Sequence, residues 1–134
     1  MLSKKNQYAI KAVGYLAGKF NEGPVGIMEI AEKKNIPLKF LENILLELKK
    51  KGFLDSKKGK GGGYFLITDP AETSIASIIR AIDGPIALLP CVSLYFYEKC
   101  SDCNEKKCKI NKVFAEARDA SLAVLENKKL NDII

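Results

Sequence analysis

The chain has 134 residues, of which 47% are hydrophobic and 28% are charged, a composition that supports a packed core and excludes global disorder. It contains no histidine, so it lacks the usual general base, the Ser-His-Asp and Cys-His arrangements, and any zinc site that needs imidazole. Ordinary hydrolytic chemistry is therefore not expected, and our prediction is a protein that is not an enzyme and has no small-molecule substrate. Because no apolar run reaches the roughly 18 residues that span a bilayer, and no signal-peptide pattern opens the chain, we expect a cytoplasmic protein without a membrane partner.

The net charge of +6 is confined to the first half of the chain. Residues 1–70 hold thirteen lysines and seven acidic side chains, whereas residues 71–134 hold nine side chains of each sign. A basic half favours a polyanionic partner such as nucleic acid, because each neutralised phosphate releases condensed counterions. A lysine-rich surface that is merely solvated is the alternative.

Three helices are predicted before the first glycine-rich turn. Ser3 can cap the first helix, whose apolar residues recur at helical spacing to about Phe20. A short helix follows at about 27–34, and Pro37 then suits the first turn of a third helix at about 38–51. The buried face of this third helix is predicted from its apolar stripe, which consists of Leu41, Ile44, Leu45 and Leu48.

A basic β-hairpin is predicted next. Apolar runs at 53–56 and 64–67 flank residues 57–63, which are rich in lysine and glycine. The order of helix, short helix, turn, helix and basic hairpin is that of a winged helix-turn-helix. We therefore assign residues 1–70 to a DNA-binding domain, and the predicted fold class is mainly α with a small β-hairpin.

The second half, residues 71–134, is predicted to carry a connecting helix at about 75–82, an irregular cysteine-rich sensing loop at about 86–107 and a long last helix at about 108–127. The last helix has an apolar stripe that needs a partner. It packs either on its own chain or across a two-fold interface, and the second choice suits a homodimer on a palindromic operator. The stripe consists of Val113, Ala117, Ala120, Val124 and Leu125.

The start of the third helix is the first candidate for contact with double-stranded DNA, since this end of a helix-turn-helix enters the major groove. Asn43 can pair with adenine, Glu42 can accept from a cytosine amino group, and Phe40 can touch a thymine methyl. Lys39 lies beside them in the sequence. The solvated face of an ordinary amphipathic helix is the alternative.

The hairpin tip is the second candidate. Its glycines allow unusual backbone angles and close approach to a surface, and its lysines supply charge that pairs with phosphate. A nucleotide-phosphate loop does not fit, because no helix begins directly after the glycines, but a plain flexible turn stays open. The residues concerned are Lys57, Lys58, Lys60, Gly61, Gly62, Gly63 and Tyr64.

All four cysteines lie close together, in the spacing Cys91-x8-Cys100-x2-Cys103-x4-Cys108. In a reducing cytoplasm, clustered cysteines are metal ligands or redox switches more often than structural disulfides. Four thiolates can hold an iron–sulfur cluster of either the [2Fe–2S] or the [4Fe–4S] type, with zinc as a weaker alternative. A redox disulfide, buried bystander thiols and a thioredoxin-like dithiol at Cys100 and Cys103 also stay open, although the last lacks a βαβ context.

Several motifs of the chain occur together in one known family. The most specific are the glycine-rich block from Lys58 to Tyr64 and the segment from Ile79 to Pro85, and Phe40-Leu41-Glu42 is another. Over nearly its whole length the chain resembles the Rrf2 family of bacterial transcription regulators. The resemblance implies a homodimeric winged-helix DNA binder with a long C-terminal dimerisation helix. Many members, including those that control cluster assembly or sense nitric oxide, hold an iron–sulfur cluster before that helix.

The resemblance also assigns positions around the cysteines. Cys91 matches the first family cysteine, Cys108 the last, and either Cys100 or Cys103 the middle one. Asn111 stands where the cluster-assembly regulator has a histidine. Our hypothesis is that the additional cysteine replaces this histidine and gives an all-thiolate site.

Three functions follow, in order of support. The first is a DNA-binding regulator whose affinity depends on an iron–sulfur cluster. The second is the same regulator with a disulfide or zinc switch, and the third is a small thiol oxidoreductase. The resemblance favours the first two, because Phe40, Glu42 and Asn43 fall on base-contacting positions of the family, and Lys58 and 61–64 fall on its wing.

Overall fold

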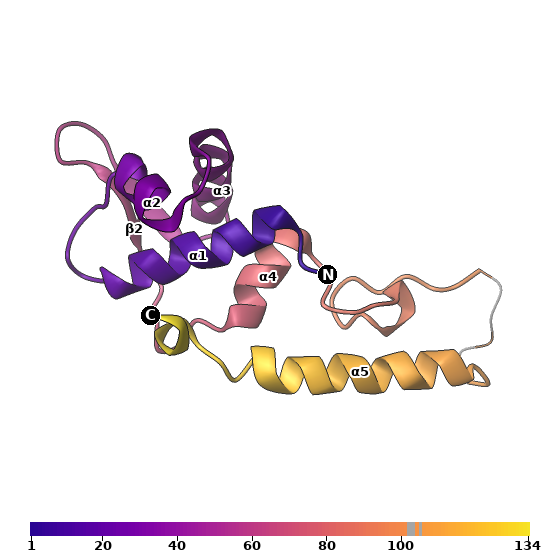
Figure 1. Ribbon diagram of the computed structural model, residues 1–134. Coiled ribbons are helices and arrows are strands. Elements are labelled where there is room, and N and C mark those ends of the chain that lie inside the picture. Colours follow the sequence, from indigo (N-terminus) through magenta and orange to yellow (C-terminus); the bar gives the residue numbers. More distant parts are fainter. Residues whose placement is uncertain (102–103, 105) are drawn as a thin grey trace.

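The computed structural model describes residues 1–101, 104 and 106–134, and it is mainly helical with an antiparallel hairpin (Figure 1). This confirms the predicted fold class. The 3-10 helices η1 and η2 were not predicted. In chain order the elements are α1 (Lys4–Gly18), α2 (Ile27–Lys34), α3 (Leu38–Lys50), β1 (Leu54–Lys57), β2 (Gly63–Leu66), α4 (Ile75–Asp83), η1 (Pro90–Val92), α5 (Lys109–Leu125) and η2 (Leu130–Ile133).

Helix α1 is the element on which the others pack. Ser3 caps it as predicted, since its hydroxyl accepts a hydrogen bond from the Asn6 backbone N–H at 3.0 Å. The helix ends at Gly18 rather than near Phe20, because the N–H groups of Lys19 and Phe20 bond back only three residues and tighten the last turn. Alanines on its buried face let neighbours approach closely, and α1 contacts α2, α3, α4, β2 and η2.

The third helix buries the predicted stripe of Leu41, Ile44, Leu45 and Leu48 completely. It begins at Leu38 as predicted, but Pro37, which was expected in the first turn, is instead the N-cap residue with extended backbone. Asn35 adopts a left-handed conformation, with a φ of 52°, and ends α2. The turn between α2 and α3 is therefore only three residues long, as a helix-turn-helix requires.

The two strands lie one residue closer to the tip than the predicted runs, with Leu54 opposite Leu66 and Lys57 opposite Gly63. A third segment joins it, because Val25 and Tyr64 exchange two backbone hydrogen bonds of 2.8 and 2.9 Å. At Gly63, where φ is +150°, an added Cβ would lie 2.1 Å from the Val25 carbonyl oxygen. Only glycine fits there, and this close approach fixes the hairpin on the loop before α2.

The core continues past residue 70 into α4, whose Ile75, Ile78 and Ile79 join the same buried cluster as α1 and α3. Ser74 caps α4 through its hydroxyl. Near the end of the chain, η2 returns to α1, where Leu130 is buried and Ile133 lies against Gly14.

The elements packed around α1, namely α2, α3, α4, the hairpin and η2, form one helical lobe. Helix α5 extends away from this lobe, and residues 86–101 lie beside the first half of α5 (Figure 1). It is slightly shorter than predicted, because Cys108 is its N-cap and Leu125 its last residue. In α5 only Leu122 is fully buried, whereas Val113 and Val124 are 62% and 56% exposed. The predicted stripe is therefore largely unpartnered by the residues of the chain that the structure describes. Among the described residues, no helix has the length and apolar character needed to cross a membrane.

Candidate DNA interface and cysteine site

The first residues of α3 have one buried and one exposed face. Leu41 is fully buried and anchors this end of the helix, whereas Lys39, Phe40, Glu42 and Asn43 are exposed. The four predicted contact residues therefore lie together on the outer face of α3. This placement leaves their side chains free to meet a major groove.

Phe40 is held from outside α3 by a residue that the sequence analysis missed. The ring of Tyr8 in α1 lies 6.2 Å from the Phe40 ring, tilted by 51°, and the Lys4 ammonium lies 5.2 Å from the Tyr8 ring centre. Such contacts favour one orientation of Phe40, although its side chain is 56% exposed. Tyr8 belongs to the apolar pattern that predicts α1, and this pattern carries no signal for a contact with Phe40.

The hairpin tip, residues 57–63, presents Lys57, Lys58 and Lys60 to solvent. Gly62 turns the chain inward, since its N–H donates to the Gly59 carbonyl at 3.0 Å and an added Cβ would lie 2.1 Å from the Lys57 carbonyl oxygen. In Figure 1 the tip and α3 both lie along the upper edge of the lobe, away from α5. The hairpin tip therefore lies on the same side of the lobe as α3.

Two of the predicted hairpin residues serve the fold as well. Gly63 approaches Val25 closely, and Tyr64 is half-buried with its backbone paired to Val25. Lys49 near the end of α3 donates to the Ser56 hydroxyl of β1 at 2.7 Å. These contacts fix the position of the hairpin relative to α3, which a rigid two-part DNA contact requires.

Three of the predicted ligand cysteines meet at one hollow of about 420 Å³ beside the start of α5. Cys91 and Cys108 are half-buried and Cys100 is exposed. Cys91 lies in η1, and Arg118 of α5 fastens η1 by donating to the Val92 carbonyl at 2.7 Å. The fourth predicted ligand, Cys103, lies outside the described residues.

Asn111 contacts two of these thiols. Its backbone N–H donates to the Cys108 sulfur at 3.3 Å, and its side-chain amide donates to the Cys91 sulfur at 3.4 Å. In residues 1–101, 104 and 106–134, no three His, Cys, Asp or Glu side chains already stand in a metal-holding arrangement. The types of residue present nevertheless fit a metal centre bound by thiolates. Free thiols line one hollow, and N–H groups of Asn111 donate to two of the sulfurs.

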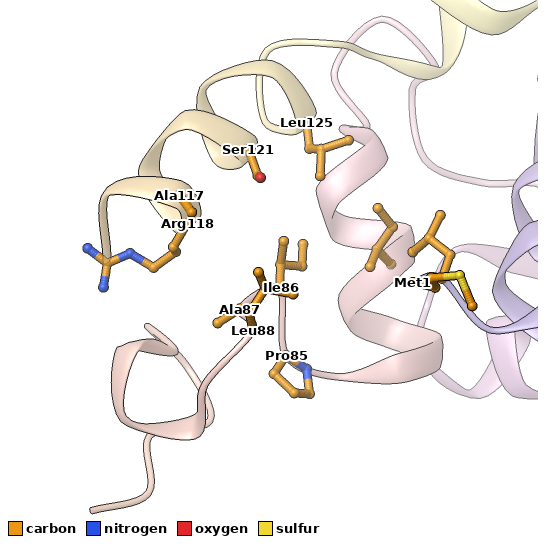
Figure 2. Close-up of a pocket in the computed structure, with 11 residues that line it drawn as sticks. Met1, Pro85, Ile86, Ala87, Leu88, Ala117, Arg118, Ser121 and Leu125 are labelled. Carbon is orange, nitrogen blue, oxygen red and sulfur yellow. The ribbon is translucent and has the colours of Figure 1, made fainter. Parts of the chain in front are cut away.

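A second hollow, of about 230 Å³, lies where the cysteine-bearing half joins the helical lobe (Figure 2). Residues 85–88, which lead from α4 toward η1, form one wall, and α5 contributes Ala117, Ser121 and Leu125. Met1 and Leu2 reach it from the start of α1. The segment that leads to the cysteines therefore lies next to the beginning of α1.

A hydrogen-bond network fixes this junction. Asp83, the last residue of α4, accepts from both the hydroxyl and the backbone N–H of Ser3, while the buried Asn6 donates to the Ile79 carbonyl at 3.2 Å. Partial burial acts to raise the pKa of Asp83, but hydrogen bonds from Ser3 and Asn6 and the charge of Lys5 outweigh it. The pKa therefore lies below its ordinary value of 3.8.

Comparison with known proteins decides the family. The model of the Rrf2 family, described as iron-dependent transcriptional regulators, matches residues 2–134. The chain belongs to the Rrf2 family. An rrf2-like HTH-type transcriptional regulator of Rhodobacter capsulatus is 42% identical to it over 138 residues, which cover all of this chain and 92% of that protein.

Two solved Rrf2-type structures share the fold. CymR of B. subtilis, titled the global cysteine regulator of that organism, superposes with a TM-score of 0.81 at 29% identity, covering 99% of this chain and 95% of that one. The IscR of T. potens superposes with a TM-score of 0.76 at 28% identity, covering 99% and 85%. This Rrf2 chain is thus a transcription regulator and not an enzyme, which removes the oxidoreductase alternative.

We predict that Asp83→Asn lowers the free energy of unfolding of this Rrf2 protein by about 0.5–1 kcal/mol at pH 7, a small loss because Asp83 is exposed. A carboxyl whose folded-state pKa is lowered stabilises the fold above its unfolded pKa, and this contribution is lost as the pH falls through the folded pKa. The difference between wild type and variant should therefore be constant above about pH 5 and shrink below about pH 4.

Urea unfolding at a series of pH values measures this difference. Ser3→Ala removes the hydroxyl donor to Asp83 and also the cap of α1, so it should lower stability at every pH and reduce the part that depends on pH. A difference that does not change with pH would contradict the role assigned to the ionised carboxylate.

Proposed function

We propose that this Rrf2 regulator binds operator DNA as a homodimer and that its cysteine site controls the affinity. The observation that carries the proposal is the exposed polar face of α3, with Phe40 held by Tyr8 and the lysine-bearing hairpin beside it. The lobe thus offers one exposed α-helix, an element that the major groove of DNA admits, and one basic, glycine-rich hairpin tip. These are the two contact elements of a winged helix-turn-helix.

Within α3, each exposed side chain matches a chemical feature of the major groove. The Asn43 amide fits the paired donor and acceptor of adenine, and the Glu42 carboxylate accepts from a cytosine amino group. Phe40 offers an apolar surface to a thymine methyl, and Lys39 offers a charge to phosphate. Base contacts would come from α3, and the lysines of the hairpin tip would position the protein on the backbone or minor groove.

The homodimer is supported by the unpartnered face of α5. Ile110, Val113 and Val124 are each more than half exposed along this helix. Pairing the same face of a second copy about a two-fold axis would bury these side chains and place two α3 helices on the two half-sites of a palindrome.

We predict that Asn43→Ala lowers affinity for the operator by about 1–3 kcal/mol, or about 5–150-fold, and relaxes base preference at one position of each half-site. Lys58→Ala should instead weaken binding to all sequences about equally and reduce the slope of log affinity against log salt by about one per site. The operator is first selected from a random-sequence pool, and affinities are then measured by fluorescence anisotropy at several salt concentrations.

Lys128→Ala is the matched control, because Lys128 is also an exposed lysine but lies beyond α5, far along the chain from the hairpin. It should leave both affinity and salt slope unchanged. Equal losses for Lys128→Ala and Lys58→Ala would show that the hairpin has no specific role.

The control element in our proposal is an iron–sulfur cluster held by Cys91, Cys100 and Cys108, with Cys103 as the fourth ligand. When bound, the cluster supplies an iron centre that is sensitive to oxidation and to small reactive molecules. The support lies in the thiol-lined hollow, the absence of histidine from the chain, and the family description as iron-dependent. Control through a disulfide or zinc is the second candidate, and a disulfide is favoured by the likeness to the CymR of Staphylococcus aureus, one structure of which is titled an oxidized form.

The residues of this chain offer a physical connection from the cysteines to α3. Residues 85–88 lead directly from Asp83 toward η1, so a rearrangement of the cysteine segment would act on the Asp83–Ser3 contact and on the start of α1. Tyr8 lies one turn further along α1 and contacts Phe40. A coupling free energy of about 1–3 kcal/mol would change operator affinity by about 5–150-fold.

We predict that protein purified without oxygen contains iron and acid-labile sulfide in equal amounts and shows a visible charge-transfer band that air bleaches. Replacing Cys91 or Cys108 by Ala should abolish both. Iron-free protein that stays colourless after attempted reconstitution would contradict the cluster, and bound zinc or a reversible disulfide would then identify the second candidate.

A further inference from the structure

Asn111 joins two sulfurs that lie far apart in the sequence. It occupies the first turn of α5, where its backbone N–H donates to the Cys108 sulfur at 3.3 Å. Its side-chain amide reaches across to η1 and donates to the Cys91 sulfur at 3.4 Å. Both distances are short enough for hydrogen bonds to sulfur, whose atomic radius exceeds that of oxygen. Asn111 is half-buried and lines the same hollow as the cysteines.

The chemistry of the asparagine side chain decides what this contact can do. An amide carries two N–H donors and no charge at any ordinary pH, so unlike a thiolate or an imidazole it is a poor ligand for iron but a good donor to sulfur. The resemblance to the cluster-assembly regulator implies a histidine at this position there, and an imidazole is a potential ligand. The asparagine of this chain keeps a hydrogen-bond donor there and gives up the ligand.

We propose that Asn111 is a positioning residue that holds the Cys91 and Cys108 sulfurs together and sets the reduction potential of the centre without ligating it. This inference rests on the proposed cysteine site. Hydrogen bonds to cysteine sulfurs stabilise the more negative, reduced form of an iron–sulfur centre. Removing the donor therefore lowers the reduction potential, while all the ligands stay in place.

The first test is a redox titration of anaerobically purified wild type, Asn111→Leu and Asn111→Asp, in which a dye-mediated titrant supplies one electron per centre. Leucine matches the size of asparagine without a donor, and aspartate matches its shape with an acceptor in place of the amide. Both variants should keep the wild-type iron content. At a fixed potential, each should show at least a tenfold lower ratio of reduced to oxidised centre, which is about 59 mV for a one-electron couple.

Asn127→Leu is the matched control, since Asn127 lies beyond the far end of α5 and donates only to the Ala123 carbonyl within the described contacts. It should leave the potential unchanged. An unchanged potential in both Asn111 variants would overturn the proposal, and so would loss of iron from Asn111→Leu with retention in Asn111→Asp, because a carboxylate can ligate iron and this split would identify position 111 as a ligand.

The second test needs no metal. In ¹⁵N-labelled, reduced, metal-free protein, the Asn111 side-chain amide should exchange with solvent more slowly than that of the exposed Asn43. The protection should fall several-fold in Cys91→Ala and persist in Cys100→Ala. Equal exchange in wild type and Cys91→Ala would overturn the contact.

The two tests separate the inference from the proposed function. If wild-type protein takes up no cluster, the iron–sulfur proposal fails, and the exchange experiment alone decides whether Asn111 positions Cys91. If the cluster forms but the Asn111 variants behave like wild type, the inference fails and the proposed function stands.

Discussion

The beginning of α1 is the point on which the arrangement of this Rrf2 protein depends. Ser3 caps α1 and at the same time donates twice to Asp83 at the end of α4, so one residue joins the first helix to the connecting helix. From there α1 runs through the core and contacts α2, α3, α4, β2 and η2. Packed interiors do not deform smoothly, so in our proposal a displacement at the Ser3 end would be carried along α1 to Tyr8 and Phe40.

This geometry gives the two halves of the chain different tasks. The lobe built on α1 holds the exposed face of α3 and the basic hairpin in a fixed relation, supported by the Val25–Tyr64 pairing and the Lys49–Ser56 hydrogen bond. The second half contains a hollow lined by thiols and a helix with an unpartnered apolar face. A rigid DNA-binding lobe joined to a site of soft, oxidisable ligands is a physically simple way to make operator binding depend on a chemical signal.

Local signals in the sequence were sufficient for most of the helical architecture. Ser3 as a cap, the stripe of α3 and the bounds of α2 were all predicted, because capping and helical periodicity depend on residues a few positions apart. The strands of the hairpin lie one residue closer to the tip than predicted, and the pairing of Tyr64 with Val25 was not predicted, because that partner is distant in the sequence. The contacts of Asp83 with Ser3 and of Asn111 with Cys91 were also beyond sequence reasoning, since both join residues brought together only by the tertiary fold.

The central claim is that the state of the cysteine site changes the affinity of the lobe for its operator. The most direct measurement is the operator affinity of anaerobically purified protein before and after iron is removed with a chelator, at one salt concentration and with thiols kept reduced. We expect the two affinities to differ by about 5–150-fold, and the difference to shrink when Asp83→Asn weakens the connection to α1. Equal affinities for the loaded and the iron-free wild type would contradict the claim and leave a DNA-binding protein whose cysteines serve another purpose.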